Sequence, residues 1–226
     1  MTAPRFLRFA RWGLLSGALM TLAAYFGPWV PHSVAGLVVS GLDLGEYVKF
    51  LPPVINGEIS IWREGFYLPL VTVSLALSLC AFRRELAYHA AVRALLLALA
   101  GVAALNMLPP AWTPGLLRTP EFRLQTAAIA ACLSALLASP LLALLPRWTP
   151  ALFVTALSTA TLYFAIIQFS RVLPAIEALY NQDIQHGWGF WLLPVGVILL
   201  AASTLALAFT QAPSLNVTSR STAPLG

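Results

Sequence analysis

The sequence has few charged residues. Only 9% of its 226 residues are Asp, Glu, Lys or Arg, whereas 59% are hydrophobic, and the mean hydropathy is +0.82. An ordinary soluble domain carries about 25% charged residues, which it needs to cover its surface. The composition therefore excludes a water-soluble domain, a disordered chain and a nucleic-acid-binding domain. It predicts a multi-pass integral membrane protein whose main partner is the lipid bilayer.

Cysteine and histidine are also scarce. The two cysteines, Cys80 and Cys132, both fall in apolar runs, which excludes a framework of extracellular disulfides. None of the three histidines falls at the centre of an apolar run, so a haem held by two histidines is not expected. The sequence has no Gly-rich phosphate loop, no GxSxG motif and no HExxH motif. We therefore expect no catalytic residue, no metal site and no cofactor.

Long apolar runs dominate the rest of the chain. A bilayer core is about 30 Å thick, so a helix of about 20 largely apolar residues is needed to cross it. The runs are continuously apolar, which is typical of helices rather than of barrel strands. We predict an all-α bundle of six transmembrane helices that forms one domain over 1–210, followed by a flexible cytoplasmic tail over 211–226. The expected spans are 12–30, 66–82, 89–108, 121–145, 150–171 and 188–210.

Prolines mark the boundaries of two spans. Thr119-Pro120 and Thr149-Pro150 each place a capping residue before a proline, which is typical of a helix start. We expect the fourth and fifth spans to begin at these two dipeptides. Pro140 falls inside the fourth span and predicts a kink there.

The charged residues divide unequally between the two sides of a six-span protein. The side that holds both termini carries eight arginines and Glu85, a net charge of +7, whereas the other side has a net charge of −2. The positive-inside rule then places both termini in the cytoplasm. No organelle-targeting segment is evident, which favours a prokaryotic plasma (inner) membrane. Arg5, Arg8 and Arg11 precede a long apolar run, which we interpret as a retained signal-anchor helix.

The longest segment on the predicted outer side contains a short amphipathic helix. Ser40 and Asp43 fit a capping box, and Asp43, Glu46 and Lys49 would then lie along one helix face. Such a helix would rest on the outer membrane surface. It would serve either as a lid over the bundle or as a docking surface for a partner.

A second outer segment, 171–188, contains Asp183 and His186 at the i, i+3 spacing of a helix. Both residue types bind metals, but a metal site needs three or four such ligands. No further ligand motif accompanies them, so we interpret the two residues as solvated loop residues that could contact a partner.

A polar cluster is expected on the cytoplasmic side at the base of the third span. Glu85, His89 and Arg93 are spaced i, i+4, i+8 and would form one stripe, with Arg84 beside it. One interpretation is local charge pairing near lipid headgroups. The other is a docking face for a cytoplasmic protein.

Small residues recur at helical spacing on two spans. Gly13 and Gly17 form a GxxxG motif on the first span, and such motifs let helices approach closely in lipid. The fourth span repeats a small residue every fourth position. These stripes would serve either packing within the bundle or contact with another membrane subunit. The stripe on the fourth span consists of Ala127, Ala131, Ala135 and Ser139.

Three functions remain open on the sequence alone. No span has a charged residue at its centre, which argues against transport of ions or protons. We expect a non-catalytic accessory or assembly subunit of a larger membrane complex, with other membrane protein subunits as partners. One alternative is a permease-like component for an uncharged or amphipathic solute, working with a separate ATPase. The other is an enzyme acting on lipid at the outer face through Glu46, Asp183 or His186.

Overall fold

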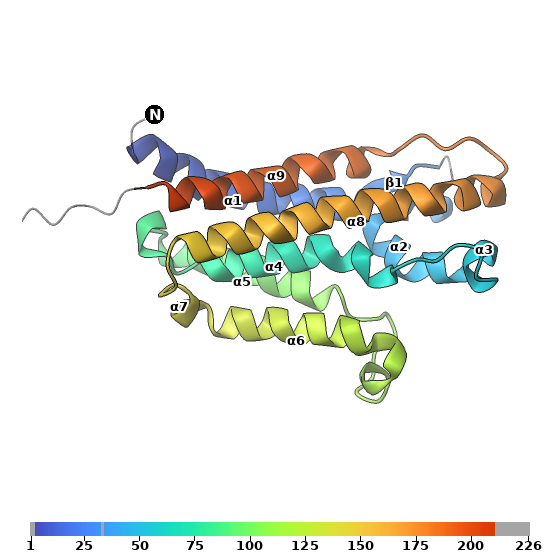
Figure 1. Ribbon diagram of the computed structural model, residues 1–226, viewed down its shortest axis with the longest axis horizontal. Helices are drawn as coiled ribbons and strands as arrows, with labels where there is room; N and C mark the ends of the chain where they lie inside the picture. Colours follow the sequence, from blue (N-terminus) through green and yellow to red (C-terminus); the bar gives the residue numbers. More distant parts are fainter. Residues whose placement is uncertain (1–2, 33, 211–226) are drawn as a thin grey trace, which may run out of the picture.

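The computed structural model describes residues 3–32 and 34–210, and these residues are mostly helical, with one short two-stranded sheet (Figure 1). The all-α prediction is therefore confirmed. Six longer helices lie side by side along the long axis of the molecule, and each falls within or across one of the expected spans. They are α1 (Ala3–Phe26), α4 (Leu68–Cys80), α5 (Ala90–Leu105), α6 (Arg123–Leu137), α8 (Trp148–Tyr180) and α9 (Trp188–Ala208).

Short elements connect these helices. Between α1 and α4, strand β1 (Pro28–Val30) pairs antiparallel with β2 (Val39–Ser40), and helices α2 (Gly41–Tyr47) and α3 (Pro52–Ile55) follow. Helix α7 (Ser139–Leu142) links α6 to α8. The remaining connections include six turns of 3₁₀-helix, which are η1 (Ala35–Leu37), η2 (Val48–Phe50), η3 (Arg63–Tyr67), η4 (Arg84–Leu86), η5 (Leu116–Arg118) and η6 (Pro120–Phe122).

Two helices of the described residues, α8 and α9, are long and apolar enough to cross a membrane by length and composition. Helix α5 is apolar but has only 16 residues. Helix α4 has 13 residues, which span about 20 Å at the usual rise of an α-helix, and η3 extends it at the N-terminal end. Six membrane-spanning helices therefore remain a prediction.

The boundaries of α8 differ from those expected. The helix begins at Trp148, before Thr149-Pro150, and Arg147 precedes it without a side-chain cap, so Thr149 is not the capping residue. It then continues past Arg171, where the expected span ends, through Pro174 to Tyr180. A charged residue does not end a helix by itself. The helix ends where Asn181 adopts the left-handed conformation, with φ at +52°.

Pro140 interrupts the expected fourth span more strongly than a kink would. Helix α6 ends at Leu137, and α7 begins at Ser139 with Pro140 in its first turn, so the predicted kink is a break between two helices. Proline is tolerated in a first turn because its missing N–H needs no partner there. Thr119 precedes the 3₁₀ turn η6 rather than α6 itself.

The GxxxG motif of α1 packs inside the bundle against α9. A Cβ atom added to Gly17 would lie 2.9 Å from the backbone N of Leu200 and 3.0 Å from the carbonyl oxygen of Gly196. Gly13 faces Ser203 one turn away. Only glycine lets the two backbones approach this closely, which favours the internal-packing interpretation for Gly13 and Gly17.

Most of the small-residue stripe of α6 does not pack closely against another helix of the bundle. Helix α6 lies at one edge of the bundle and packs against α4 and α5 (Figure 1). Ala127 and Ala131 are exposed, and Ala135 is half-buried. Ser139 alone is buried, and its hydroxyl donates a hydrogen bond to the carbonyl of Ser78 in α4. The exposed part of this stripe has no partner among the described residues.

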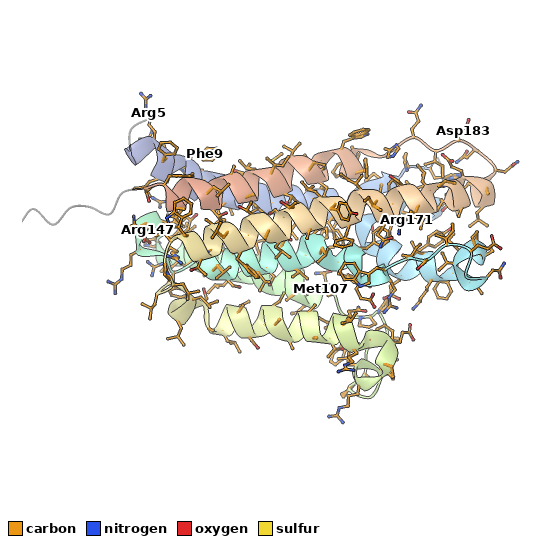
Figure 2. All side chains as sticks on the ribbon, viewed as in Figure 1. Arg5, Phe9, Met107, Arg147, Arg171 and Asp183 are labelled. Carbon is orange, nitrogen blue, oxygen red and sulfur yellow. The ribbon has the colours of Figure 1, made fainter. Side chains whose placement is uncertain are left out.

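Charged residues separate to the two ends of the bundle. Near the start of α1 and at the α4–α5 and α6–α8 connections, the only described charges are seven arginines and Glu85 (Figures 1 and 2). We call this the basic end. The opposite end, which holds α2, α3 and the last turns of α8, is the acidic end. The arginines of the basic end are Arg5, Arg8, Arg11, Arg83, Arg84, Arg93 and Arg147.

Candidate functional site

The expected capping box forms at the start of α2 on the acidic end. The Ser40 hydroxyl accepts a hydrogen bond from the Asp43 backbone N–H at 3.3 Å, and an Asp43 carboxylate oxygen accepts one from the Ser40 backbone N–H at 2.9 Å. The helix ends at Tyr47, and Lys49 lies in the 3₁₀ turn that continues it. The capping box therefore holds Asp43 at a fixed position beside the bundle.

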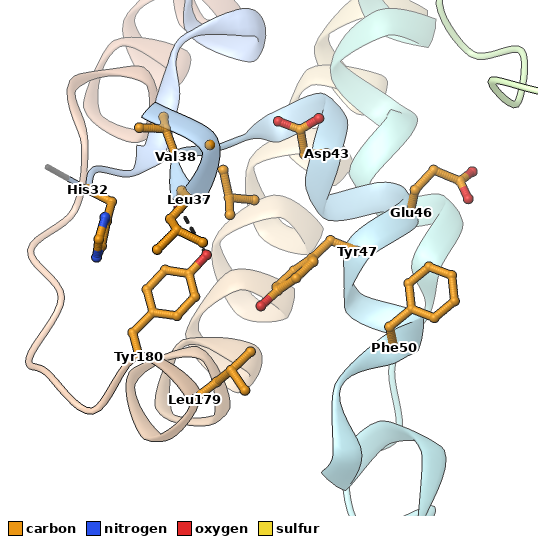
Figure 3. A pocket seen from close by; sticks show the side chains of 11 residues that line it. His32, Leu37, Val38, Asp43, Glu46, Tyr47, Phe50, Leu179 and Tyr180 are labelled. Carbon is orange, nitrogen blue, oxygen red and sulfur yellow. Dashed lines mark hydrogen bonds between the residues drawn. The ribbon is translucent and has the colours of Figure 1, made fainter. Parts of the chain in front are cut away.

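Asp43 and Glu46 line a cavity of about 830 Å³ between α2, the segment 36–39 and the last turn of α8 (Figure 3). We call this cavity the outer pocket. Its wall is mixed, with two carboxylates and two tyrosine hydroxyl groups among apolar side chains. The lining residues are His32, Gly36, Leu37, Val38, Val39, Asp43, Glu46, Tyr47, Phe50, Leu179 and Tyr180.

Two tyrosines direct their hydroxyl groups toward the space between α2 and α8 (Figure 3). Tyr180 donates a hydrogen bond to the carbonyl of Leu37 at 3.0 Å, which ties α8 to the 36–39 segment. Burial, together with the nearby Tyr180, raises the pKa of Tyr47 to about 12. Tyr47 is therefore neutral at pH 7 and offers a donor. The ring of His32 packs edge-on against Tyr180, with centroids 5.4 Å apart.

Glu46 and Lys49 belong to a network that fixes α2 to the bundle. Glu46 accepts a hydrogen bond from the Tyr67 hydroxyl at 2.9 Å and pairs with Lys49 at 2.8 Å. Glu121, just before α6, lies 3.5 Å from Lys49 and 3.2 Å from Arg63. These contacts join three segments that are far apart in the sequence. Their geometry fits the expected role of a lid over the end of the bundle.

Asp183 and His186 do not share a helix face, because α8 ends at Tyr180 and α9 begins only at Trp188. Both residues lie in the loop between these helices, as the loop interpretation predicts, and Asp183 is exposed. The His186 ring instead packs against Phe190 at 4.7 Å and Phe169 at 5.5 Å between ring centroids. Within residues 3–32 and 34–210, no group of three or more His, Cys, Asp or Glu side chains could hold a metal ion.

The expected polar stripe on the basic end is wrong as a helix face. Glu85 lies in the 3₁₀ turn η4, Ala87 has a φ of +45°, and α5 begins only at Ala90, with His89 as its N-cap. The chain therefore turns between Glu85 and Arg93, and His89 accepts a hydrogen bond from the Ala91 N–H instead of facing them. Glu85 contacts Arg147, at the start of α8, at 2.8 Å.

Sequence reasoning missed several residues of the outer pocket. Tyr47 falls on the expected helix but away from its charged face, and His32 and Tyr180 are separated from it by long stretches of chain. Only the packing of α8 beside α2 brings the three together. No family model, no curated protein and no solved structure matches this chain. Its function must therefore be inferred from the chemistry of its own surfaces.

Proposed function

We propose that the chain is an inner-membrane protein with six spans and both termini in the cytoplasm. It acts as a non-catalytic accessory or assembly subunit of a larger membrane complex. The exposed small-residue face of α6 is the observation that carries this proposal. The separation of basic and acidic ends supports the topology, since the basic end would face the cytoplasm.

The two sides of α6 differ in what covers them. Ile129 and Cys132 are buried against the bundle, whereas Ala127 and Ala131 are exposed on a side that no described helix covers. The exposed apolar surface also includes Leu137, whose side chain is 79% exposed. Lipid removes the hydrophobic driving force between helices, so small residues promote association by allowing close backbone contact. This face suits the docking of a helix from another subunit.

A single matched pair of substitutions tests the docking face. Ala131→Trp should block close approach of a partner helix, whereas Ala156→Trp places the same side chain at an exposed position on α8. After purification in a mild detergent, we expect a stoichiometric partner with the unmodified chain and with Ala156→Trp, and loss of that partner with Ala131→Trp. A chain that purifies alone as a monomer would contradict the proposal.

The outer pocket favours a second candidate function, a permease-like component for an amphipathic solute. Its volume suits a small molecule, and Tyr47 and Tyr180 offer polar groups beside an apolar wall. If this function holds, solute flux into liposomes should fall when Tyr47 is replaced by Ala and should persist in Ala131→Trp.

A further inference from the structure

The basic end contains a second cavity, of about 550 Å³, which the proposed subunit role does not use. It lies between the segment 82–85, the first turn of α5 and the segment 140–147. Its charged lining consists of Arg83, Arg84, Arg93, Arg147 and Glu85. We call it the arginine pocket.

Arg83 is the most unusual residue in this pocket, because only 1% of its surface is exposed. Its Nε has no hydrogen-bond partner among the described residues. Its Nη2 reaches only the carbonyl oxygen of Pro146, at 3.5 Å, which is the limit for a hydrogen bond. A buried guanidinium normally has a carboxylate or several acceptors beside it, since an uncompensated buried charge is costly.

Arg93 is in a similar position. Its Nε is also buried without a partner within the described part of the chain. Its guanidinium carbon lies 5.4 Å from the centroid of the Phe82 ring, a contact with a neutral group. Both arginines therefore line the pocket with unused donors.

Glu85, the one acid of the pocket, is already engaged. Its carboxylate accepts from Arg147 Nε at 2.8 Å, and Arg147 also donates to the carbonyl of Thr210. Partial burial would raise the pKa of Glu85. Hydrogen bonds from its own backbone and from Arg147, with the charges of Arg147 and Arg83, outweigh this effect and hold the pKa below 4.5. One carboxylate cannot balance four guanidinium groups.

The seven remaining Asp and Glu residues all lie on or near the acidic end. No carboxylate of the described residues is therefore left to balance Arg83 and Arg93.

We propose that the arginine pocket binds a phosphate group, supplied by the headgroup of an anionic phospholipid or as free phosphate. Guanidinium groups bind phosphate oxygens through paired hydrogen bonds, which the unused Nε donors allow. The pocket rim is apolar, with Leu144 75% exposed beside Leu145 and Phe82, and would contact lipid acyl chains. Basic pockets between helices at the cytoplasmic leaflet are suited to anionic headgroups.

The proposal is tested with the full chain, stripped of lipid, in a neutral detergent. The thermal unfolding midpoint is measured against added phosphatidylglycerol, phosphatidylcholine or inorganic phosphate. A ligand that binds only the folded state raises this midpoint. We expect phosphatidylglycerol to raise it and phosphatidylcholine to leave it unchanged. A rise with inorganic phosphate alone would identify free phosphate as the source.

Substitutions test whether the rise in the unfolding midpoint comes from binding in the arginine pocket. Arg93→Gln and Arg84→Gln should weaken the apparent affinity about tenfold or more, as expected for loss of a charge-assisted hydrogen bond. Arg5→Gln removes the same charge from the basic end outside the pocket and should behave as the unmodified chain. Arg83→Gln should weaken the apparent affinity as well. Because Arg83 is buried, this variant could fail to fold, and the result with Arg93→Gln then decides, since Arg93 is partly exposed. The proposal is overturned if neither phosphatidylglycerol nor phosphate raises the midpoint, if phosphatidylcholine matches them, or if Arg93→Gln and Arg5→Gln respond alike.

Discussion

At the scale of single residues, the close contact between α1 and α9 depends on glycine. The GxxxG pattern predicted that Gly13 and Gly17 would meet another helix, and the structure identifies that helix as α9. The partner was not predicted from the sequence, although the residues of α9 that face α1 do follow a pattern. Gly189, Gly196 and Ser203 are small residues at seven-residue spacing, and Gly196 lies against Thr21.

Replacing Gly17 by Ala should destabilise the protein, since the new Cβ would meet backbone atoms of Leu200 and Gly196. Overpacking of this kind costs roughly 1–3 kcal/mol. Gly101→Ala is the matched control, because its Cβ would meet only a Leu136 side-chain atom at 3.5 Å. Alanine favours a helix over glycine by roughly 0.8–1 kcal/mol, so this control should be neutral or stabilising. Unfolding midpoints in detergent that rise for both variants would refute the close contact.

The Glu85–Arg147 pair should make stability depend on pH. Because the folded pKa of Glu85 is lowered below 4.5, its contribution is present above about pH 4.5 and is lost as pH falls through the folded pKa. Glu85→Gln should therefore lower stability at pH 7, by about 1 kcal/mol or less since solvent screens the pair. The difference from the unmodified chain should disappear at low pH. Exposed Glu58→Gln serves as the control, and an equal pH response in both variants would exclude the pair as the cause.

At the scale of elements, the positions of the six longer helices were predictable and several of their ends were not. Apolar runs set where a helix can lie, but α8 passes Arg171 because charge alone does not end a helix. The Glu85–His89–Arg93 stripe failed for the opposite reason, since the left-handed Ala87 interrupts a spacing that suits a helix. The outer pocket could not be predicted from the sequence, because it depends on how α2 and α8 pack together.

A buried hydrogen bond joins α4 to α8. The hydroxyl groups of Thr72 and Thr161 lie 2.6 Å apart, and both residues are fully buried. We expect a double-mutant cycle of Thr72→Val and Thr161→Val to give a coupling energy of about 0.6 kcal/mol, as is usual between helices in a bilayer. Thr159 is exposed and bonds to the carbonyl of Thr155 in its own helix. Its replacement by Val should therefore show no coupling to Thr72, and coupling of similar size would contradict the assignment.

At the scale of the whole molecule, the separation of charge gives the bundle a direction. Seven arginines and one glutamate occupy the described part of the basic end, while seven acids lie on or near the acidic end. The sequence predicts this separation only if the helices alternate in direction. The bundle in Figure 1 places the segments that carry the two sets at opposite ends.

Two reporter fusions test the proposed orientation. A reporter joined after Leu225 should be active in the cytoplasm, and one inserted at the exposed turn Asn56-Gly57 should be active only outside. In a chain in which Arg5, Arg8 and Arg11 are replaced by Gln, the preference for this orientation should weaken. Activity of both fusions on the same side would refute the six-span arrangement.

The length of α8 affects which molecules can reach the outer pocket at the acidic end. Its 33 residues extend about 50 Å, well beyond the ~30 Å of hydrocarbon that a spanning helix must cross. In the six-span arrangement, the surplus carries Tyr180 and the outer pocket past the headgroups and into the aqueous space. A molecule dissolved outside the cell would then reach the pocket without entering the bilayer.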